Sequence, residues 1–247
     1  MKRKDFIKNT LLIGTGLSML PSFSFSSFDE TYTRSQLIGK GNPDIVGDSY
    51  TSIMHRETKA ALKRMSDAAA SENIKIEVVS AFRSFQRQKE IFEGKFNRFT
   101  AQGLTPLAAI EKIIAYSTIP GTSRHHWGTD IDIIDGNAVR PTSLLQAKNF
   151  HGQGPFCKMK EWLDTHAESF GFYEVYTDNP QRKGFEYEPW HFSYAAVSKP
   201  MLVAYRELDL KTVFQEEKVK GSAHFTDDFI TRYRKENILD INPRLLA

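Results

Sequence analysis

Residues 123–134 read Ser-Arg-His-His-Trp-Gly-Thr-Asp-Ile-Asp-Ile-Ile, so residue types that bind metals run directly into a strand-like pattern. From Thr129 to Ile134 acidic and apolar residues alternate with a period of two, which is typical of a strand with two different faces. The pattern predicts that Asp130 and Asp132 point to one side while the isoleucines that alternate with them face the core. We therefore expect a strand that carries polar chemistry on one face.

Helices and short strands are predicted on both sides of this strand. Apolar spacing predicts helices over 56–70, 85–99 and 105–116, the last with Thr105 as N-cap and Pro106 at the first helical position. Further strands are expected over 74–82, 172–176 and 190–194, and a helix from about 155 to 170 should end at Gly171. Two more helices, over 198–208 and 226–237, form a C-terminal structural wrap. Helices interspersed with short strands predict an α+β fold.

The N-terminus has the order of a secretory signal. The first eight residues carry four basic residues and one acid, which account for the whole net charge of +3. An apolar run over 11–20 and a small-residue stretch over 22–27 follow, so we expect a signal peptide over 1–27 and export to the periplasm or cell surface. The Arg3-Lys4 pair resembles a twin-arginine signal and leaves the route open. An uncleaved anchor is the alternative, although the apolar run is shorter than the roughly 20 residues of a membrane span.

The rest of the chain is close to neutral, which argues against nucleic-acid binding, since that needs a surplus of Lys and Arg on one face. Its 247 residues fit one catalytic domain. We expect a polar linker over 28–49 and a catalytic domain over 50–247 with a C-terminal helical extension. After signal cleavage we expect no transmembrane helix, and the protein is expected to be a monomer. The lone Cys157 has no partner for an intramolecular disulfide.

Two phrases carry candidate chemistry: the one around His125 and Asp132, and Glu188-Pro189-Trp190-His191. Catalytic zinc takes three protein ligands from His and carboxylate groups and keeps a fourth position open. His125, Asp132 and His191 meet that need, and Gly128 permits the tight bend between the first two. Because Pro189 disfavours a helix at Glu188, this is not the helical HExxH site. Residues three apart in a straight strand face opposite ways, so Glu188 and His191 share a site only if the chain bends near Pro189.

A resemblance to a known family rests on three motifs. Beside the two phrases above, residues 80–88, Ser-Ala-Phe-Arg-Ser-Phe-Gln-Arg-Gln, are similar to a family segment of the form Ser-x-x-Arg-Ser-x-x-x-Gln. In this order, over about residues 80–194, the chain resembles the zinc D-alanyl-D-alanine carboxypeptidases linked to vancomycin resistance. The resemblance implies a small antiparallel sheet with flanking helices, like that of hedgehog and DD-peptidase domains.

The resemblance also implies roles for individual residues. Zinc would be held by His125, Asp132 and His191, with Glu188 as the catalytic base and Arg83 steadying the oxyanion. A guanidinium suits that task because it is always charged and donates two hydrogen bonds. The residues implied to line the peptide site are Gln88, Ser123 and Trp190.

The sequence departs from the family pattern at two points. Asp130 stands where relatives often have a small residue, and Phe192 and Ser193 follow His191 where relatives often carry an Arg. Asp130 either supports the metal site by a hydrogen bond or caps the turn, and the sequence leaves both open. His126 is an alternative ligand to His125, or a residue that hydrogen-bonds substrate.

The sequence thus predicts a zinc carboxypeptidase that trims peptidoglycan stem peptides, with no organic cofactor. Alternatives are an LD-carboxypeptidase, a peptidoglycan endopeptidase, and a non-catalytic zinc-containing domain that binds the cell wall.

Overall fold

The computed structural model describes residues 32–246, so the predicted signal peptide lies outside the described residues. The described helices are α1 (Arg34–Leu37), α2 (Arg56–Ala70), α3 (Phe85–Ala101), α4 (Pro106–Ile114), α5 (Cys157–His166), α6 (Ala195–Arg206), α7 (Leu210–Glu216) and α8 (Asp227–Tyr233). The strands are β1 (Ile45–Val46), β2 (Met54–His55), β3 (Ile76–Ser80), β4 (Asp130–Asp135), β5 (Phe172–Glu174) and β6 (His191–Tyr194). None of the described helices is long and apolar enough to span a membrane.

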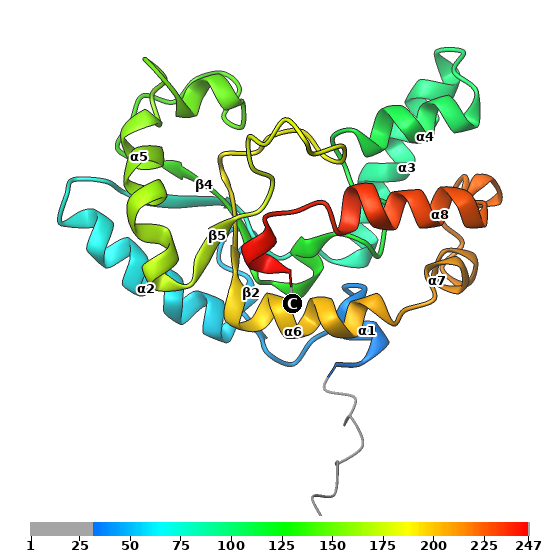
Figure 1. Ribbon diagram of the computed structural model, residues 1–247, viewed down its shortest axis with the longest axis horizontal. Helices are drawn as coiled ribbons and strands as arrows, with labels where there is room; N and C mark the ends of the chain where they lie inside the picture. The colour runs from blue at the N-terminus through cyan, green and yellow to red at the C-terminus, as the bar shows by residue number, and fades with distance from the viewer. Residues whose placement is uncertain (1–31, 247) are drawn as a thin grey trace, which may run out of the picture.

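A four-stranded antiparallel sheet in the order β3-β4-β6-β5 forms the centre of the molecule, and β1 pairs with β2 apart from it. Figure 1 shows α2 and α5 at one end of the molecule and α3, α4, α7 and α8 at the other. The α+β fold with a small antiparallel sheet is therefore confirmed.

Local signals in the sequence explain where the helices start and stop. Thr105 caps α4 by accepting a hydrogen bond from the backbone N–H of Ala108, and Pro106 occupies its first turn, as predicted. The helix expected to end at Gly171 does so through a 3-10 turn over Ala167–Phe170, and Gly171 has the left-handed φ of 83° that ends it.

The central strand is more enclosed than the alternating pattern predicts. All six residues of β4 are buried, the aspartates included. Ile131 and Ile133 pack in a core cluster with residues of α2 and α5, such as Met65 and Leu163. The opposite face of a central strand would normally meet solvent, but here the side chains of the candidate site cover it.

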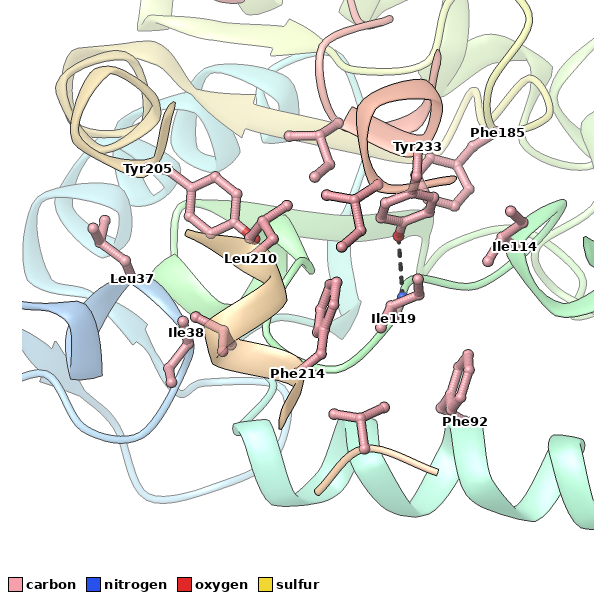
Figure 2. Close-up of a cluster of buried hydrophobic side chains, with 14 of the residues drawn as sticks. Leu37, Ile38, Phe92, Ile114, Ile119, Phe185, Tyr205, Leu210, Phe214 and Tyr233 are labelled. Atoms are coloured by element: carbon pink, nitrogen blue, oxygen red, sulfur yellow. Dashed lines mark hydrogen bonds between the residues drawn. The ribbon is translucent and has the colours of Figure 1, made fainter. Parts of the chain in front are cut away.

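The C-terminal helices belong to the main core. Met201, Phe214 and Tyr233 share one hydrophobic cluster with Phe92 of α3 and Ile110 of α4. Figure 2 shows Tyr233 reaching the chain at Ile119, whose backbone N–H donates to the Tyr233 hydroxyl at 3.1 Å. The predicted wrap therefore supports the loop that leads into residues 123–127, and α7 is a helix that the sequence pattern did not predict.

The segment expected as a polar linker differs from that expectation over its described part. Thr33 caps α1 in a capping box, and Leu37 and Ile38 are almost completely buried in the main core. The Trp127 indole N–H donates to the Leu37 carbonyl at 3.0 Å. The buried Leu37 and Ile38 therefore dock residues 33–40, in which they are the apolar side chains.

Candidate active site

The candidate ligands come from three adjacent pieces of backbone. His125 lies on a 3-10 turn, η1 (Arg124–Trp127), rather than in an irregular loop, and Gly128 ends that turn with a left-handed φ of 69°. Asp132 on β4 pairs directly across the sheet with His191 on β6. The antiparallel register therefore brings together residues that lie far apart in the sequence.

These three side chains can hold one cation. One ligand atom from each of His125, Asp132 and His191 lies within 4.8 Å of the others, and all three residues are buried. His125 Nε2 is 3.5 Å from Asp132 Oδ2, and His191 Nδ1 is 4.0 Å from Asp132 Oδ1. Asp132 Oδ1 is buried without a hydrogen-bond partner among the described residues, as expected of an atom that binds a metal.

The ring orientation of His125 is set by the backbone. Its Nδ1 lies 2.7 Å from the Ala81 carbonyl oxygen, which can only accept, so Nδ1 carries the proton. The lone pair of Nε2 then faces Asp132. The Arg83 N–H donates to the His125 carbonyl at 3.0 Å and ties the turn to the segment after β3.

Glu188 reaches the cluster because the chain bends at Pro189, as the sequence pattern required. The His191 N–H donates to the Glu188 carbonyl at 3.0 Å, which closes a turn around Pro189 and Trp190. Glu188 Oε2 then lies 2.8 Å from His191 Nδ1. The bend predicted from Pro189 is therefore present.

The electrostatics of the cluster favour a positive charge at its centre. Burial opposes the charged form of His191, but hydrogen bonds to Asp130 and Glu188 and the charge of Asp132 outweigh it and raise the pKa of His191 to about 10. Burial likewise disfavours ionised Asp132, yet the nearby His125, His191 and Arg83 hold its pKa below the usual range. A field that stabilises a proton here also stabilises a divalent cation.

Within the described residues, Arg83 forms no ion pair with an acidic side chain. Its guanidinium donates to Gln88 Oε1 and to Ser80 Oγ, each at 3.2 Å, and no carboxylate within residues 32–246 is at ion-pair distance. Arg83 lines the same cavity as the three candidate ligands and Glu188. Its charge is therefore available to an anionic group in that cavity.

The predicted substrate contacts have different positions. Ser123 and Trp190 line the cavity, as expected. Gln88 does not; it is fully buried, and its amide donates to the Thr118 carbonyl at 2.7 Å and accepts from Arg83. Gln88 thus orients Arg83 instead of facing the cavity.

His126 is a structural residue. It is fully buried, its Nδ1 donates to the Arg83 carbonyl at 2.5 Å, and its Nε2 accepts from the Gly121 N–H at 3.1 Å. Both ring nitrogens are used by backbone, so the alternatives of metal ligand and substrate contact are not met.

Other residues of the cavity wall could not be found from the sequence. Tyr116, Ser117 and Thr118 follow α4, and Tyr176 and Phe185 lie between β5 and β6. Ser117, Thr118 and Phe185 stand on connections without periodicity, and Tyr116 and Tyr176 are the last residues of a predicted helix and strand. Only the tertiary fold brings them to the site. Tyr176 also packs edge-on against the His191 ring, with centroids 5.1 Å apart.

A protein-family model described as D-alanyl-D-alanine carboxypeptidase (VanY) matches residues 51–197 of this chain. The chain is 28% identical over 158 residues to a D-alanyl-D-alanine carboxypeptidase of Enterococcus faecalis, covering 64% of this chain and 54% of that protein. It is 30% identical over 168 residues to YodJ of Bacillus subtilis, which carries a carboxypeptidase name, covering 68% of this chain and 55% of YodJ. The chain thus spans about half the length of the curated relatives it matches.

Among solved structures, VanYB in complex with D-alanine-D-alanine is similar at 23% identity, with a TM-score of 0.50. The similarity covers 71% of this chain and 90% of that one. At this identity the match shows a shared fold.

Proposed function

Because the chain belongs to the D-alanyl-D-alanine carboxypeptidase family, we propose that it is a zinc-dependent carboxypeptidase that removes the terminal residue of peptidoglycan stem peptides. The observation that carries the proposal is the position of Glu188, whose Oε2 lies 2.8 Å from His191 Nδ1 at the edge of the candidate metal cluster. A domain that only binds the cell wall would not require an acid at this position.

The donor set fits zinc. Two imidazoles and one carboxylate are the ligands that catalytic zinc uses with one position left open. Bound by His125, Asp132 and His191, zinc would polarise the scissile carbonyl and lower the pKa of water towards about 7.

The protein's own residues supply the remaining chemistry. Glu188 is placed to take a proton from the attacking water and to deliver it to the leaving amine, so that the peptide bond breaks as the new C–O bond forms. The Arg83 guanidinium, held by Gln88 and Ser80, donates to the oxygen on which negative charge develops. Ser123 and Trp190 line the space for the terminal residue.

Export to the periplasm or cell surface is part of the same proposal, since the substrate is found there. The basic and apolar N-terminus supports it.

The test is release of D-alanine from a pentapeptide ending in D-Ala-D-Ala, followed by mass spectrometry with and without chelator. We expect release that chelator abolishes and zinc restores. Glu188→Gln should lower kcat by about 10²–10⁴-fold while zinc stays bound. Glu186→Gln is the matched control, because Glu186 is an exposed glutamate on the same connection.

Outcomes that contradict the proposal are distinct from one another. Full activity of Glu188→Gln would remove the assigned base. Zinc bound in equal amount without release of D-alanine would leave a metal site and refute the DD-carboxypeptidase activity; tetrapeptides and cross-linked muropeptides would then test LD-carboxypeptidase and endopeptidase activity.

A further inference from the structure

We propose that Asp130 is a positioning residue that holds the His191 imidazole with Nδ1 turned toward the metal; the proposal rests on the metal site of the proposed function. Asp130 is completely buried on β4. It is also one of the points at which this chain departs from the family pattern, so its role is not inherited from the motif.

The geometry of the ring is the first argument. His191 Nε2 lies 3.0 Å from Asp130 Oδ2. An ionised carboxylate only accepts, so Nε2 carries the hydrogen in this contact. The other nitrogen, Nδ1, then faces Glu188 Oε2 at 2.8 Å and Asp132 Oδ1 at 4.0 Å. The imidazole therefore presents Nδ1 to the candidate metal cluster.

The second argument is that Asp130 is itself held rigidly. Arg124 Nε donates to Oδ2 at 2.8 Å, and the hydroxyls of Thr129 and Ser193 donate to Oδ1 at 2.8 and 2.6 Å. Arg124 also donates through Nη2 to the Ser193 hydroxyl at 2.7 Å. A carboxylate with four donors, counting His191, cannot rotate away from the ring.

The sheet places these residues on one face. Asp130 pairs across the ladder with Ser193, and Asp132 pairs with His191. Asp130 and His191 are thus diagonal neighbours on strands β4 and β6, close enough for their side chains to meet. Asp130 and Ser193 act together, since the Ser193 hydroxyl donates to the Asp130 carboxylate.

The expected consequence is tighter metal binding with a fixed ligand atom. A carboxylate on the distal nitrogen of a ligating histidine fixes its tautomer and raises its basicity, and loss of such a partner weakens metal affinity by about 10–100-fold. If Asp130 merely neutralises Arg124, its replacement would alter folding stability without altering the metal site.

The experiment measures zinc affinity by competition with a chelator, together with the absorption spectrum of the Co²⁺-substituted protein. Asp130→Asn should bind zinc about 10–100-fold more weakly and shift the Co²⁺ spectrum. Ser193→Ala is the matched control: it removes one donor to Asp130 but keeps the contact with His191. Ser193→Ala should therefore change the zinc affinity by less than about threefold, since the loss of one hydrogen bond to Asp130 has a modest effect.

Asp130→Asn leaves the Arg124 charge buried without its partner and could prevent folding. Arg124→Gln combined with Asp130→Asn removes both charges and tests the same prediction. Nitrogen-15 NMR of the wild-type zinc protein needs no variant: the His191 Nε2 signal should be that of a protonated nitrogen.

Unchanged zinc affinity in a folded Asp130 variant, or a metal-bound Nε2, would overturn the proposal. Failure of the wild-type protein to bind zinc at all would instead overturn the proposed function. The two failures are thus distinguishable.

Discussion

The buried His126 should contribute a loss of folding stability as the pH falls. Burial outweighs the backbone hydrogen bond to Arg83 and lowers the pKa of His126 to about 3, against 6.5 for an ordinary histidine. Between these two pH values the unfolded chain binds a proton that the folded chain does not. His126 therefore leaves the free energy of unfolding unchanged at high pH and lowers it progressively as the pH falls below 6.5.

The magnitude follows from the two pKa values. Lowering the pH from 7.5 to 5 should cost about 2 kcal/mol through His126 alone, because each pKa unit is worth about 1.4 kcal/mol and only the range below 6.5 counts. In a chain of this size that lowers Tm by roughly 4–8 °C. The buried His55, whose pKa is also lowered by burial, acts in the same direction. The raised pKa of His191 acts in the opposite direction, so a variant is needed to isolate His126.

The assay is urea unfolding at both pH values in the presence of EDTA, which removes the pH dependence of metal binding. His126→Asn should unfold more easily at both pH values and show a smaller difference between them than the wild type. His151→Gln, at an exposed position, should keep the full difference. A His126 variant with the wild-type difference between pH 7.5 and 5 would refute the reasoning.

Two further variants test the packing that supports the site. Tyr233→Phe leaves the buried Ile119 N–H without the hydroxyl it donates to at 3.1 Å and should cost about 1–3 kcal/mol in urea unfolding; an unchanged midpoint would contradict this. Gly128→Ala places a methyl 2.3 Å from the Ile45 side chain at a φ of +69° and should cost about 1–3 kcal/mol. Gly103→Ala, at a φ of +92° in open space, should cost less in the same measurement, and an equal loss would mean that strain rather than crowding dominates at residue 128.

Much of the secondary structure could be predicted because its signals are local. The bounds of α2 agree with the predicted 56–70, and the N-cap and proline of α4 lie where the sequence places them. The alternation after Thr129 predicted β4, and the strand expected over 190–194 covers all of β6. Each of these signals depends on neighbours within one or two turns of chain.

Motif order also predicted which residues gather at the site. His125, Asp132 and His191 form a cluster able to hold a metal ion, and the proline before Trp190 predicted the turn that brings Glu188 to it. Their catalytic and metal-binding roles stay predictions until the experiments above are done.

The sequence alone predicts most of the helices and strands, though not α7, and names the candidate polar residues, because periodicity, caps and motif spacing are properties of neighbouring residues. Only the tertiary structure decided that Asp130 faces His191, that Gln88 supports Arg83 and that His126 is closed off by backbone. Each of these contacts depends on strand register or on the docking of distant segments. The free energy of such contacts comes from pairing and burial between elements, which no local pattern records.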